Sequence, residues 1–366
     1  LTLLTHGTFL SPRNLTNLTR QVAINGILAV GMTYVILIGG IDLSVGSVVA
    51  LAGVVAGILQ VNLGLSLWPP EQAWLATAYS LLAAVFVGLC CGIFNGWLIM
   101  RFQIAPFIIT LGMMVIARGL ALILAKGAAI SPLSESFNEL GQGYIARDYT
   151  MLLLLGTAFI LFIFQILRNL KSQIIMTLCL TGFILWMFLS YRGIPIPVLI
   201  FGVIGIVGSI LLQHTRLGRF VFALGGNAEA AWLSGVPIQK ITLGVYTVLG
   251  ALAGLSGAIL TARLNGALPT AGELFELDAI AAVVIGGTSL KGGVGSIRGS
   301  ILGAFFIGIL NNGMSLLDVT EFYQKVIKGF IIILAVWLDT RQQRSVSFVI
   351  AEKFPCDVAI SSSPKV

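Results

Sequence analysis

The stretch QVAINGILAVGMTYVILIGGIDLSVGSVVALAGVVAGILQV, residues 21–61, contains two long apolar runs on either side of the short sequence GGIDLS. Each run approaches the length that a helix needs to cross the roughly 30 Å hydrocarbon layer of a membrane. Similar runs follow along the whole chain. With the first two, they are 21–40, 44–61, 80–100, 106–125, 151–167, 174–190, 196–213, 242–264, 277–290, 299–316 and 325–339. The sequence therefore predicts an all-α polytopic membrane protein, a bundle of about 11 transmembrane helices.

The composition agrees with this prediction and excludes several other classes of protein. Of 366 residues, 57% are hydrophobic and only 10% are charged, whereas soluble domains carry about 25% charged residues. Soluble enzymes, disordered chains and secreted disulfide scaffolds are therefore excluded, and the continuous runs differ from the alternating pattern of a transmembrane β-barrel. The net charge is +7, but the basic residues stand singly between apolar runs. This spacing indicates loops at the surface of a lipid bilayer rather than nucleic-acid binding.

Charges are distributed unequally between the two sets of alternating loops. One set, together with the C-terminal end, carries 12 of the 21 Lys and Arg residues, and 9 of the 14 acidic residues fall in the other set. Loops rich in Lys and Arg stay in the cytoplasm. We therefore expect the 214–241 loop and the C-terminus to be cytoplasmic and the present N-terminus to lie outside.

Motifs for catalysis and metal binding are missing from the sequence. No GxxxxGK[ST] phosphate-binding loop is present, so we expect no nucleotide site in this chain. The two histidines, His6 and His214, lack the HExxH spacing of a metalloprotease, and the four cysteines show no CxxC spacing. We therefore predict no catalytic residue, no metal ligand and no enzyme activity.

The sequence GGIDLSVGS, residues 39–47, combines helix-breaking glycines with the polar residues Asp42 and Ser44. Either side chain can cap the helix that follows, and an ionisable residue inside a membrane is also a candidate functional group. Both interpretations of Asp42 stay open. The segment is echoed by IGGTSLKGGVGS at 285–296, which favours a parallel internal repeat. The similarity of 116–125 to 326–335 favours an inverted repeat instead.

A second polar stretch, GGNAEAAWLSGVPIQK at 225–240, lies in the only sizeable loop on the predicted cytoplasmic side. It combines good helix formers with Gly235 and Pro237, which end a helix. A short helix outside the membrane suits contact with a soluble partner, and an ordinary loop between two spans is the alternative. The residues that we expect to make this contact are Gly225, Gly226, Asn227, Glu229, Ala230, Ala231, Ser234 and Gly235.

Several side-chain amides lie within the apolar runs or at their ends. A neutral amide exchanges hydrogen bonds with a polar solute, and it also joins neighbouring helices in lipid. These two roles remain alternatives for each residue. The candidate residues for a polar path through the membrane are Asn25, Asp42, Ser44, Asn95, Asn265, Asn311 and Asn312.

Five stretches carry a resemblance to a known family. They are IDLSVGS (41–47), NGWLI (95–99), PFIITLGMMVIARG (106–119), GGNAEAAWLSGV (225–236) and ELDAIAAVVIGGTSL with GGVGS (276–296). Together they resemble the permease subunits of bacterial ABC monosaccharide importers, the ribose, xylose and arabinose group. The extra apolar hairpin at 151–190, with RGIPIPVL (192–199) and NNGMSLLDV (311–319), is similar to the D-xylose permeases in particular.

This resemblance implies a type II ABC importer permease architecture. It implies that this chain binds no cofactor, because ATP and Mg are bound by a partner subunit. The implied partners are a second copy of the permease in a homodimer, an ATPase that docks on the 214–241 coupling loop, and a periplasmic sugar-binding protein that delivers a monosaccharide. The implied location is the bacterial inner membrane.

The resemblance also implies a domain organisation and a function. Residues 1–344 are expected to form one transmembrane permease domain, with the first helix of the family missing before Leu1. Residues 345–366 are expected to form a disordered tail. The predicted function is the transmembrane subunit of an ATP-driven pentose uptake system, with D-xylose as the expected sugar. An ion-coupled secondary sugar carrier is the alternative, with Asp42 as its candidate for binding a coupling ion.

Overall fold

The computed structural model describes residues 2, 5, 7–61, 69–167, 171–334, 336 and 337. Over these ranges the chain is helical, with no β-strand and two isolated β-bridges. The predicted all-α fold is therefore confirmed. The chain divides into two compact units, Leu1–Val319 and Thr320–Val366. The expected domain boundary at 344 and the tail at 345–366 lie outside the described residues.

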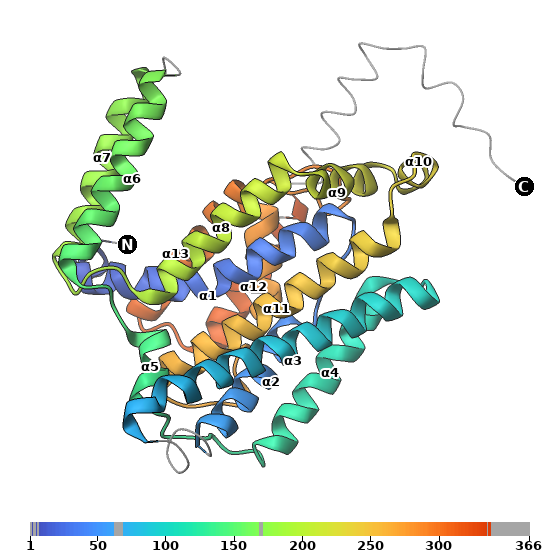
Figure 1. Cartoon of the computed structure of the whole chain (residues 1–366), viewed down its shortest axis with the longest axis horizontal. Helices are drawn as coiled ribbons and strands as arrows, with labels where there is room; N and C mark the ends of the chain where they lie inside the picture. Colours follow the sequence, from blue (N-terminus) through green and yellow to red (C-terminus); the bar gives the residue numbers. More distant parts are fainter. Residues whose placement is uncertain are drawn as a thin grey trace, which may run out of the picture. The chain divides into compact units, whose positions relative to one another are not determined.

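The described part of the first unit is built from helices of very different length (Figure 1). They are α1 (Pro12–Leu37), α2 (Val45–Leu59), α3 (Ala73–Phe102), α4 (Pro106–Leu124), α5 (Glu135–Gln142), α6 (Arg147–Leu167), α7 (Lys171–Leu189), α8 (Ile196–His214), α9 (Arg216–Gly226), α10 (Ala228–Leu233), α11 (Ile238–Leu264), α12 (Phe275–Ile285) and α13 (Ile297–Leu316), with short 3-10 turns at Thr8–Leu10 and Pro70–Gln72. In the second unit, residues 321–334 are helical.

Within the described ranges, each predicted apolar run overlaps a helix, but the helices differ in length. In the described residues, α1, α3, α4, α8, α11 and α13 are long and apolar enough to cross a membrane. At a rise of 1.5 Å per residue, α2 and α12 are only about 22 Å and about 16 Å long. The run at 277–290 thus contains a helix that covers about half of the hydrocarbon layer, because glycines end it at Ile285.

Helix α1 begins at Pro12, well before the predicted run at 21–40. Ser11 caps it, with Oγ accepting the N–H of Asn14 at 3.3 Å, and Pro12 occupies the first helical position. The early turns contain polar residues that are nevertheless buried, such as Thr16. Hydropathy alone therefore placed the start of the helix too late.

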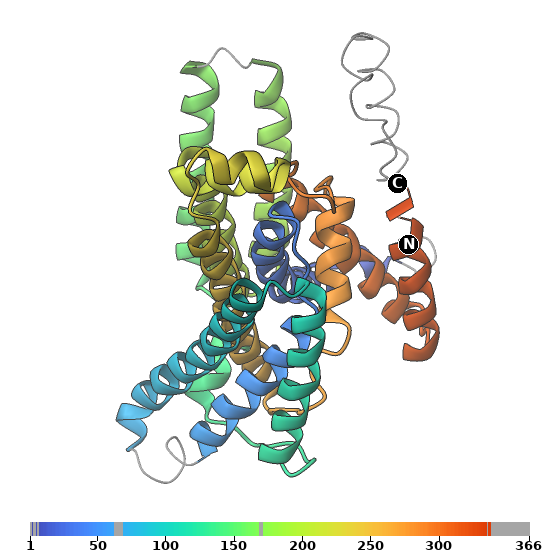
Figure 2. The same cartoon turned by 90° about the vertical axis from the view of Figure 1, so that its right-hand side faces the viewer.

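The helices α1 and α11 form the centre of the first unit. Helix α1 packs against α8, α11, α12 and α13, and α11 also packs against α2, α3 and α5. Figure 1 shows α1 and α11 between α8 on one side and α3 and α4 on the other. Figure 2, in which α1 is seen nearly end-on, shows α12 directly beside it.

Helices α3 and α11 approach each other closely along rows of glycine. Gly88 and Gly92 of α3 face Gly250 and Gly254 of α11, and a Cβ at any of these positions would collide with backbone atoms of the other helix. Small residues permit such close packing between membrane helices. The glycine row on α3 therefore makes a contact within one chain.

The predicted extra hairpin at 151–190 corresponds to α6 and α7, which lie side by side. The C-terminal end of α7 packs on α1, where Met187 and Phe188 belong to one buried apolar cluster with Leu15. Most large apolar side chains along both helices are exposed, among them Leu152 and Ile175 at 72% each. Such a surface is suited to contact with lipid.

Candidate functional site

Two non-helical segments, 38–44 and 265–274, lead into the short helices α2 and α12, and the beginnings of these helices meet. A Cβ at Gly46, in the first turn of α2, would collide with the carbonyl oxygen of Gly272 and the carboxylate of Glu276. Non-helical backbone is tolerated at membrane depth only where protein or water surrounds it. These segments are therefore the natural place to look for polar groups inside the helix bundle.

The first polar cluster joins Asp42, Ser44 and Asn95, three of the predicted path residues. Asp42 Oδ1 accepts the Ser44 backbone N–H at 2.7 Å and the Ser44 hydroxyl at 2.6 Å, and Asn95 Nδ2 of α3 donates to Ser44 Oγ at 3.1 Å. All three side chains are buried. Asp42 thus caps the turn before α2 rather than the helix itself. Two further buried atoms, Asn95 Oδ1 and the Tyr246 hydroxyl of α11, have no hydrogen-bond partner among the described residues.

The second polar cluster surrounds Asp278, in the first turn of α12. Asn25, halfway along α1, and Asn311 of α13 both donate to Asp278 Oδ2, at 3.5 Å and 3.2 Å. The Oδ1 atoms of both amides are buried and have no partner in the described part of the chain. The structure therefore brings two predicted path residues together around a carboxylate.

Sequence analysis missed Asp278, although a signal was present. Asp278 opens the apolar run at 277–290, and such a position is typical of the outer end of a full-length span. Because α12 is short, its first turn instead lies beside the middle of α1, and Asp278 is only 3% exposed. A buried carboxylate between membrane helices is a functional candidate.

The two remaining candidate amides lie elsewhere. Asn312 and Asn14 exchange two hydrogen bonds of 3.0 Å, which join α13 to the start of α1. Asn265 ends α11 in a left-handed conformation, and its Oδ1 accepts bonds from Leu133 N at 3.1 Å and Asn138 Nδ2 at 2.8 Å. Both residues therefore connect parts of the fold, which is the packing role that sequence analysis left open.

Arg118 makes a further polar contact, partly buried, that sequence analysis did not single out. It lies in the second half of α4, and its Nη1 donates to the carbonyl oxygens of Pro269 at 2.7 Å and Ala271 at 2.8 Å. The arginine thereby holds the 265–274 segment that leads to α12. The signal was available in the sequence, since an arginine within an apolar run is costly and has a specific role.

The short helix predicted in the 214–241 loop is present as α10. Asn227 caps its start, with Oδ1 accepting the N–H of Ala230 at 2.9 Å. Gly235, at φ +77°, ends the helix and donates its N–H to the carbonyl of Trp232 at 2.9 Å. The predicted contact residues that are exposed are Gly226, Asn227, Glu229, Ala230, Ser234 and Gly235.

The outward surface of α10 differs from the predicted one. Ala231 is only 3% exposed and packs against its own chain, so it is not available to a partner. Trp232 and Leu233 are instead 67% and 74% exposed. Sequence analysis missed both because a large apolar residue is unremarkable in so apolar a chain. Their position in a short helix between polar loops was the available signal.

Gly225, just before α10, anchors this segment to two other parts of the chain. A Cβ at Gly225 would collide with the carbonyl oxygen of Leu37, the last residue of α1, and would crowd the backbone N–H of Gly293. That N–H donates to the same Leu37 carbonyl at 2.9 Å. The α9–α10 segment therefore contacts the end of α1 and the loop between α12 and α13 at one point.

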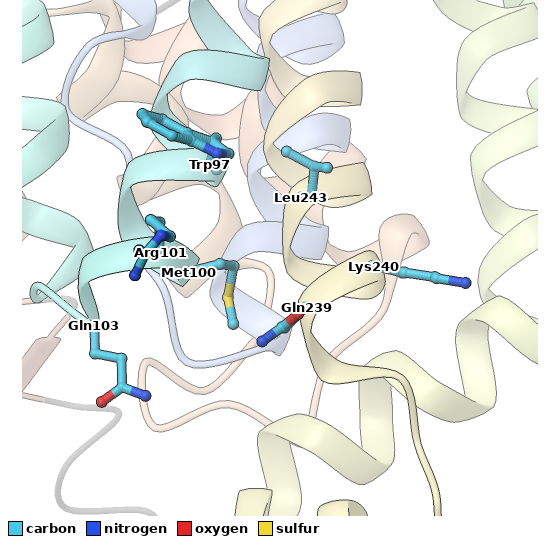
Figure 3. Close-up of a pocket in the computed structure, with 8 residues that line it drawn as sticks. Trp97, Met100, Arg101, Gln103, Gln239, Lys240 and Leu243 are labelled. Carbon is cyan, nitrogen blue, oxygen red and sulfur yellow. The ribbon is translucent and has the colours of Figure 1, made fainter.

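A groove of about 490 Å³ lies between the end of α3 and the start of α11 (Figure 3). Trp97, Met100 and Arg101 line it from α3, and Gln239 lines it from α11. Figure 3 shows Met100 and Gln239 directed toward each other, whereas Lys240 points away. The groove offers polar groups for contact, but its lining contains no hydroxyl or thiol nucleophile and no carboxylate. In the described part of the chain, no group of His, Cys, Asp and Glu side chains is arranged to hold a metal ion.

Comparison with known proteins identifies the family. The model of a family described as "Branched-chain amino acid transport system / permease component" matches residues 14–336. The chain belongs to this permease family. The permease is 39% identical to the xylose transport system permease protein of Escherichia coli, over 93% of this chain and 88% of the relative.

Other relatives of the permease are equally similar. The xylose transport system permease protein of Haemophilus influenzae is 40% identical over 93% of this chain and 92% of its own length. The ribose import permease protein of Bacillus subtilis is 39% identical over 91% of this chain and 87% of its own length. No solved structure matches the permease. The resemblance to the ribose and xylose group is thus confirmed, and the family is one of transport proteins.

Proposed function

We propose that this permease is the membrane subunit of an ATP-driven importer that carries a pentose, D-xylose in particular, across the bacterial inner membrane. Relatives named for xylose and for ribose transport match 93% and 91% of the chain, which supports a sugar as the solute. The α6–α7 hairpin favours D-xylose, because the hairpin at 151–190 carries the resemblance to D-xylose permeases.

The observation that carries the proposal is the anchored position of the α9–α10 segment. Helix α10 presents Trp232 and Leu233 outward, as a docking helix for an ATPase requires. At its base, Gly225 lies against Leu37 and Gly293. A displacement of α10 by the ATPase is therefore passed to α1 and to the loop between α12 and α13. In this arrangement the C-terminus and α10 are cytoplasmic, and the ATPase binds ATP and Mg.

The Asp278 cluster is the proposed contact for the sugar. Among the described residues, Asn25 Oδ1 and Asn311 Oδ1 are acceptors without a partner, and Asp278 is an acceptor that the two amides already share. Sugar hydroxyls donate and accept hydrogen bonds and can satisfy such atoms as the solute passes. The complete system contains two copies of the permease and a periplasmic sugar-binding protein that delivers the solute.

The docking proposal is tested with matched substitutions. Leu233→Ala and Leu302→Ala remove the same side chain from positions that are 74% and 71% exposed, the first on α10 and the second on α13. We expect Trp232→Ala and Leu233→Ala to reduce recovery of the ATPase with the tagged permease by about tenfold or more, as is usual for anchor residues of interfaces. Leu302→Ala should leave recovery unchanged. Equal recovery with all three variants would remove α10 as the contact.

The transported solute is tested by uptake into cells that express the complete system. We expect labelled D-xylose to enter faster than labelled D-ribose, and Asn311→Ala to reduce uptake while Asn312→Ala reduces stability instead. Preferential uptake of ribose would overturn the assignment of D-xylose. Uptake that follows an ion gradient and needs no ATPase would establish the secondary carrier in place of the importer.

A further inference from the structure

A groove of about 440 Å³ lies between α8 and the first two turns of α13, helices that contact each other (Figure 1). Along α8 it extends from Phe201 to His214. At the first of these ends, the ring of Phe201 lies 6.5 Å from the ring of Phe305, measured between centroids. The groove is open along its length, because Ile206 and Ile210, which line it, are 64% and 50% exposed.

The lining of this groove changes from apolar to polar along α8. Apolar side chains line the part that begins at Phe201, and hydrogen-bonding or charged side chains line the end where α8 stops. Ile206 and Ile301 belong to the first part, Gln213, His214 and Arg298 belong to the second, and Ser209 lies between them. The groove is therefore amphipathic, with its positive charge at one end.

The length of the groove matches one leaflet of a membrane. At 1.5 Å per residue, α8 rises about 20 Å from Phe201 to His214. One leaflet with its headgroup region is roughly 20–22 Å thick. The apolar part thus has the length of an acyl chain, and the polar end lies at the depth of the lipid headgroups.

Arg298 determines which kind of headgroup fits. It is exposed, and in the part of the chain that the structure describes its guanidinium has no carboxylate partner. It lies in the first turn of α13, where a positive charge is unfavourable beside the positive end of the helix dipole. Helix stability therefore does not explain its position. A guanidinium binds phosphate oxygens through charge-assisted hydrogen bonds, and the Gln213 amide is a second donor at this end.

From this geometry we infer that the groove between α8 and α13 holds one anionic phospholipid, with an acyl chain along Ile206 and Ile301 and the phosphate at Arg298. The polar end lies on the side of the α9–α10 segment, because α9 begins two residues after α8 ends at His214. The proposed function makes this side cytoplasmic, and the leaflet assigned to the lipid rests on it. Basic pockets between membrane helices on that side are suited to anionic headgroups. The bound lipid would tie α8 to the start of α13.

The headgroup contact is tested on the full chain, purified in dodecyl maltoside and freed of lipid. Native mass spectrometry measures binding of dioleoyl phosphatidylglycerol, which is anionic, and of dioleoyl phosphatidylcholine, which has no net charge. We expect the unsubstituted permease to prefer phosphatidylglycerol by about fivefold, as for one basic side chain near a headgroup, and Arg298→Gln to lose this preference. Arg219→Gln should keep it. Arg219 is the matched control because it is an exposed arginine on α9 that does not line the groove.

The acyl-chain contact is tested with a substitution that fills the apolar part. Gly202 lines the groove, and a Cβ at this position would meet no atom within 4 Å. Gly202→Leu therefore adds a side chain to the groove without a collision, and should weaken binding of both lipids by about fivefold or more. Gly156→Leu is the matched control, since a Cβ at Gly156 of α6 also meets no atom within 4 Å. It should bind both lipids like the unsubstituted chain.

Three results would overturn the inference. The first is unchanged lipid binding in folded Arg298→Gln and Gly202→Leu proteins. The second is displacement of phosphatidylglycerol by soluble glycerol phosphate, which would show a site for small anions. The third is loss of permease dimers in Gly202→Leu with unchanged lipid binding, which would assign the groove to a second copy of the chain. If Arg298→Gln fails to fold, Gly202→Leu and its control decide the question. These measurements involve neither ATPase nor uptake, so their failure is distinct from a failure of the transport proposal.

Discussion

Helices end at the sequence Ile-Gly-Gly at two places in the chain. The two non-helical segments that follow begin with the same turn but have different surroundings. The first break comprises residues 38–44 and the second break residues 286–296. Each contains a glycine in the left-handed conformation, Gly39 at φ +78° and Gly287 at φ +85°. In both, the N–H groups of this glycine and of the next residue bond back to carbonyls near the helix end, which is the Schellman pattern.

After this shared turn the two breaks diverge. The first break enters the interior, where Asp42 and Ser44 are buried and bond to each other. The second break buries Thr288 but then reaches the surface, where Lys291 is exposed and Val294 is 65% exposed. The helix ends are thus encoded by glycine in both cases, whereas burial is decided by the residues that follow. A carboxylate with its own donors can be buried, and a lysine remains in water.

The largest effect on uptake is expected at the contact between Gly225, the second break and the end of α1. Gly225→Ala should reduce uptake by about tenfold or more, because its Cβ would collide with the Leu37 carbonyl and crowd Gly293 N. Overpacking of this kind costs about 1–3 kcal/mol. Gly226→Ala is the control, since a Cβ at Gly226 meets no atom within 4 Å. Uptake assays at equal permease levels make the comparison, and equal activity of the two variants would show that the contact does not transmit movement.

The next largest effect is expected in the first break. Two substitutions of Asp42 there distinguish the role of its charge from the role of its hydrogen bonds. Asp42→Ala leaves the Ser44 N–H and hydroxyl without their acceptor, so it should lower the free energy of unfolding by about 1–3 kcal/mol. Asp42→Asn keeps an Oδ1 acceptor and should retain uptake within about twofold. Denaturation in detergent and sugar uptake are the measurements. Loss of uptake in a stable Asp42→Asn protein would show that the carboxylate charge itself is required.

A smaller effect is expected at Thr288, which follows the turn of the second break. Its hydroxyl is buried and has no hydrogen-bond partner among the described residues. Thr288→Val keeps the shape and removes the unpaired polar atom, so the free energy of unfolding should stay the same or rise by up to about 1 kcal/mol. A clear decrease in the melting temperature would reveal that the hydroxyl has a partner in the assembled protein.

The smallest effect is expected at Lys291, the exposed charge of the second break. Lys291→Ala should change the free energy of unfolding by less than about 0.5 kcal/mol, as for most surface substitutions, and uptake should stay within about twofold. If the substitution instead abolished uptake at normal permease levels, Lys291 would belong to a contact with another subunit.

Hydropathy and glycine positions were sufficient to predict the long apolar helices and their approximate ends, whereas α5 and α9 lie in stretches where no helix was predicted. The length of α12 was misjudged, because hydropathy extended the run to residue 290, past Gly286 and Gly287, and an apolar run does not reveal that its helix begins beside the middle of α1. The start of α1 was also missed, since buried polar residues such as Thr16 resemble a loop in the sequence.

The candidate site was predictable in part. Asp42, Ser44 and Asn95 lie together, and Asn25 and Asn311 share Asp278, but the amide types alone did not distinguish them from Asn312, which pairs with Asn14. Which amides meet depends on how distant helices pack, and a single sequence does not contain that information. The outward position of Trp232 likewise depends on the orientation of a six-residue helix.

The close contact between α3 and α11 has a consequence for how the protein is made. Gly88 and Gly250 are far apart in the sequence, so the glycine face of α3 has no partner until α11 has been synthesised. At about 5–20 residues per second, this interval is on the order of ten to thirty seconds. During this time the glycine face of α3, which carries no side chains, lacks its partner in a membrane crowded with other helices. Biogenesis of the protein therefore requires that this surface be kept from pairing with a foreign helix until its own partner arrives.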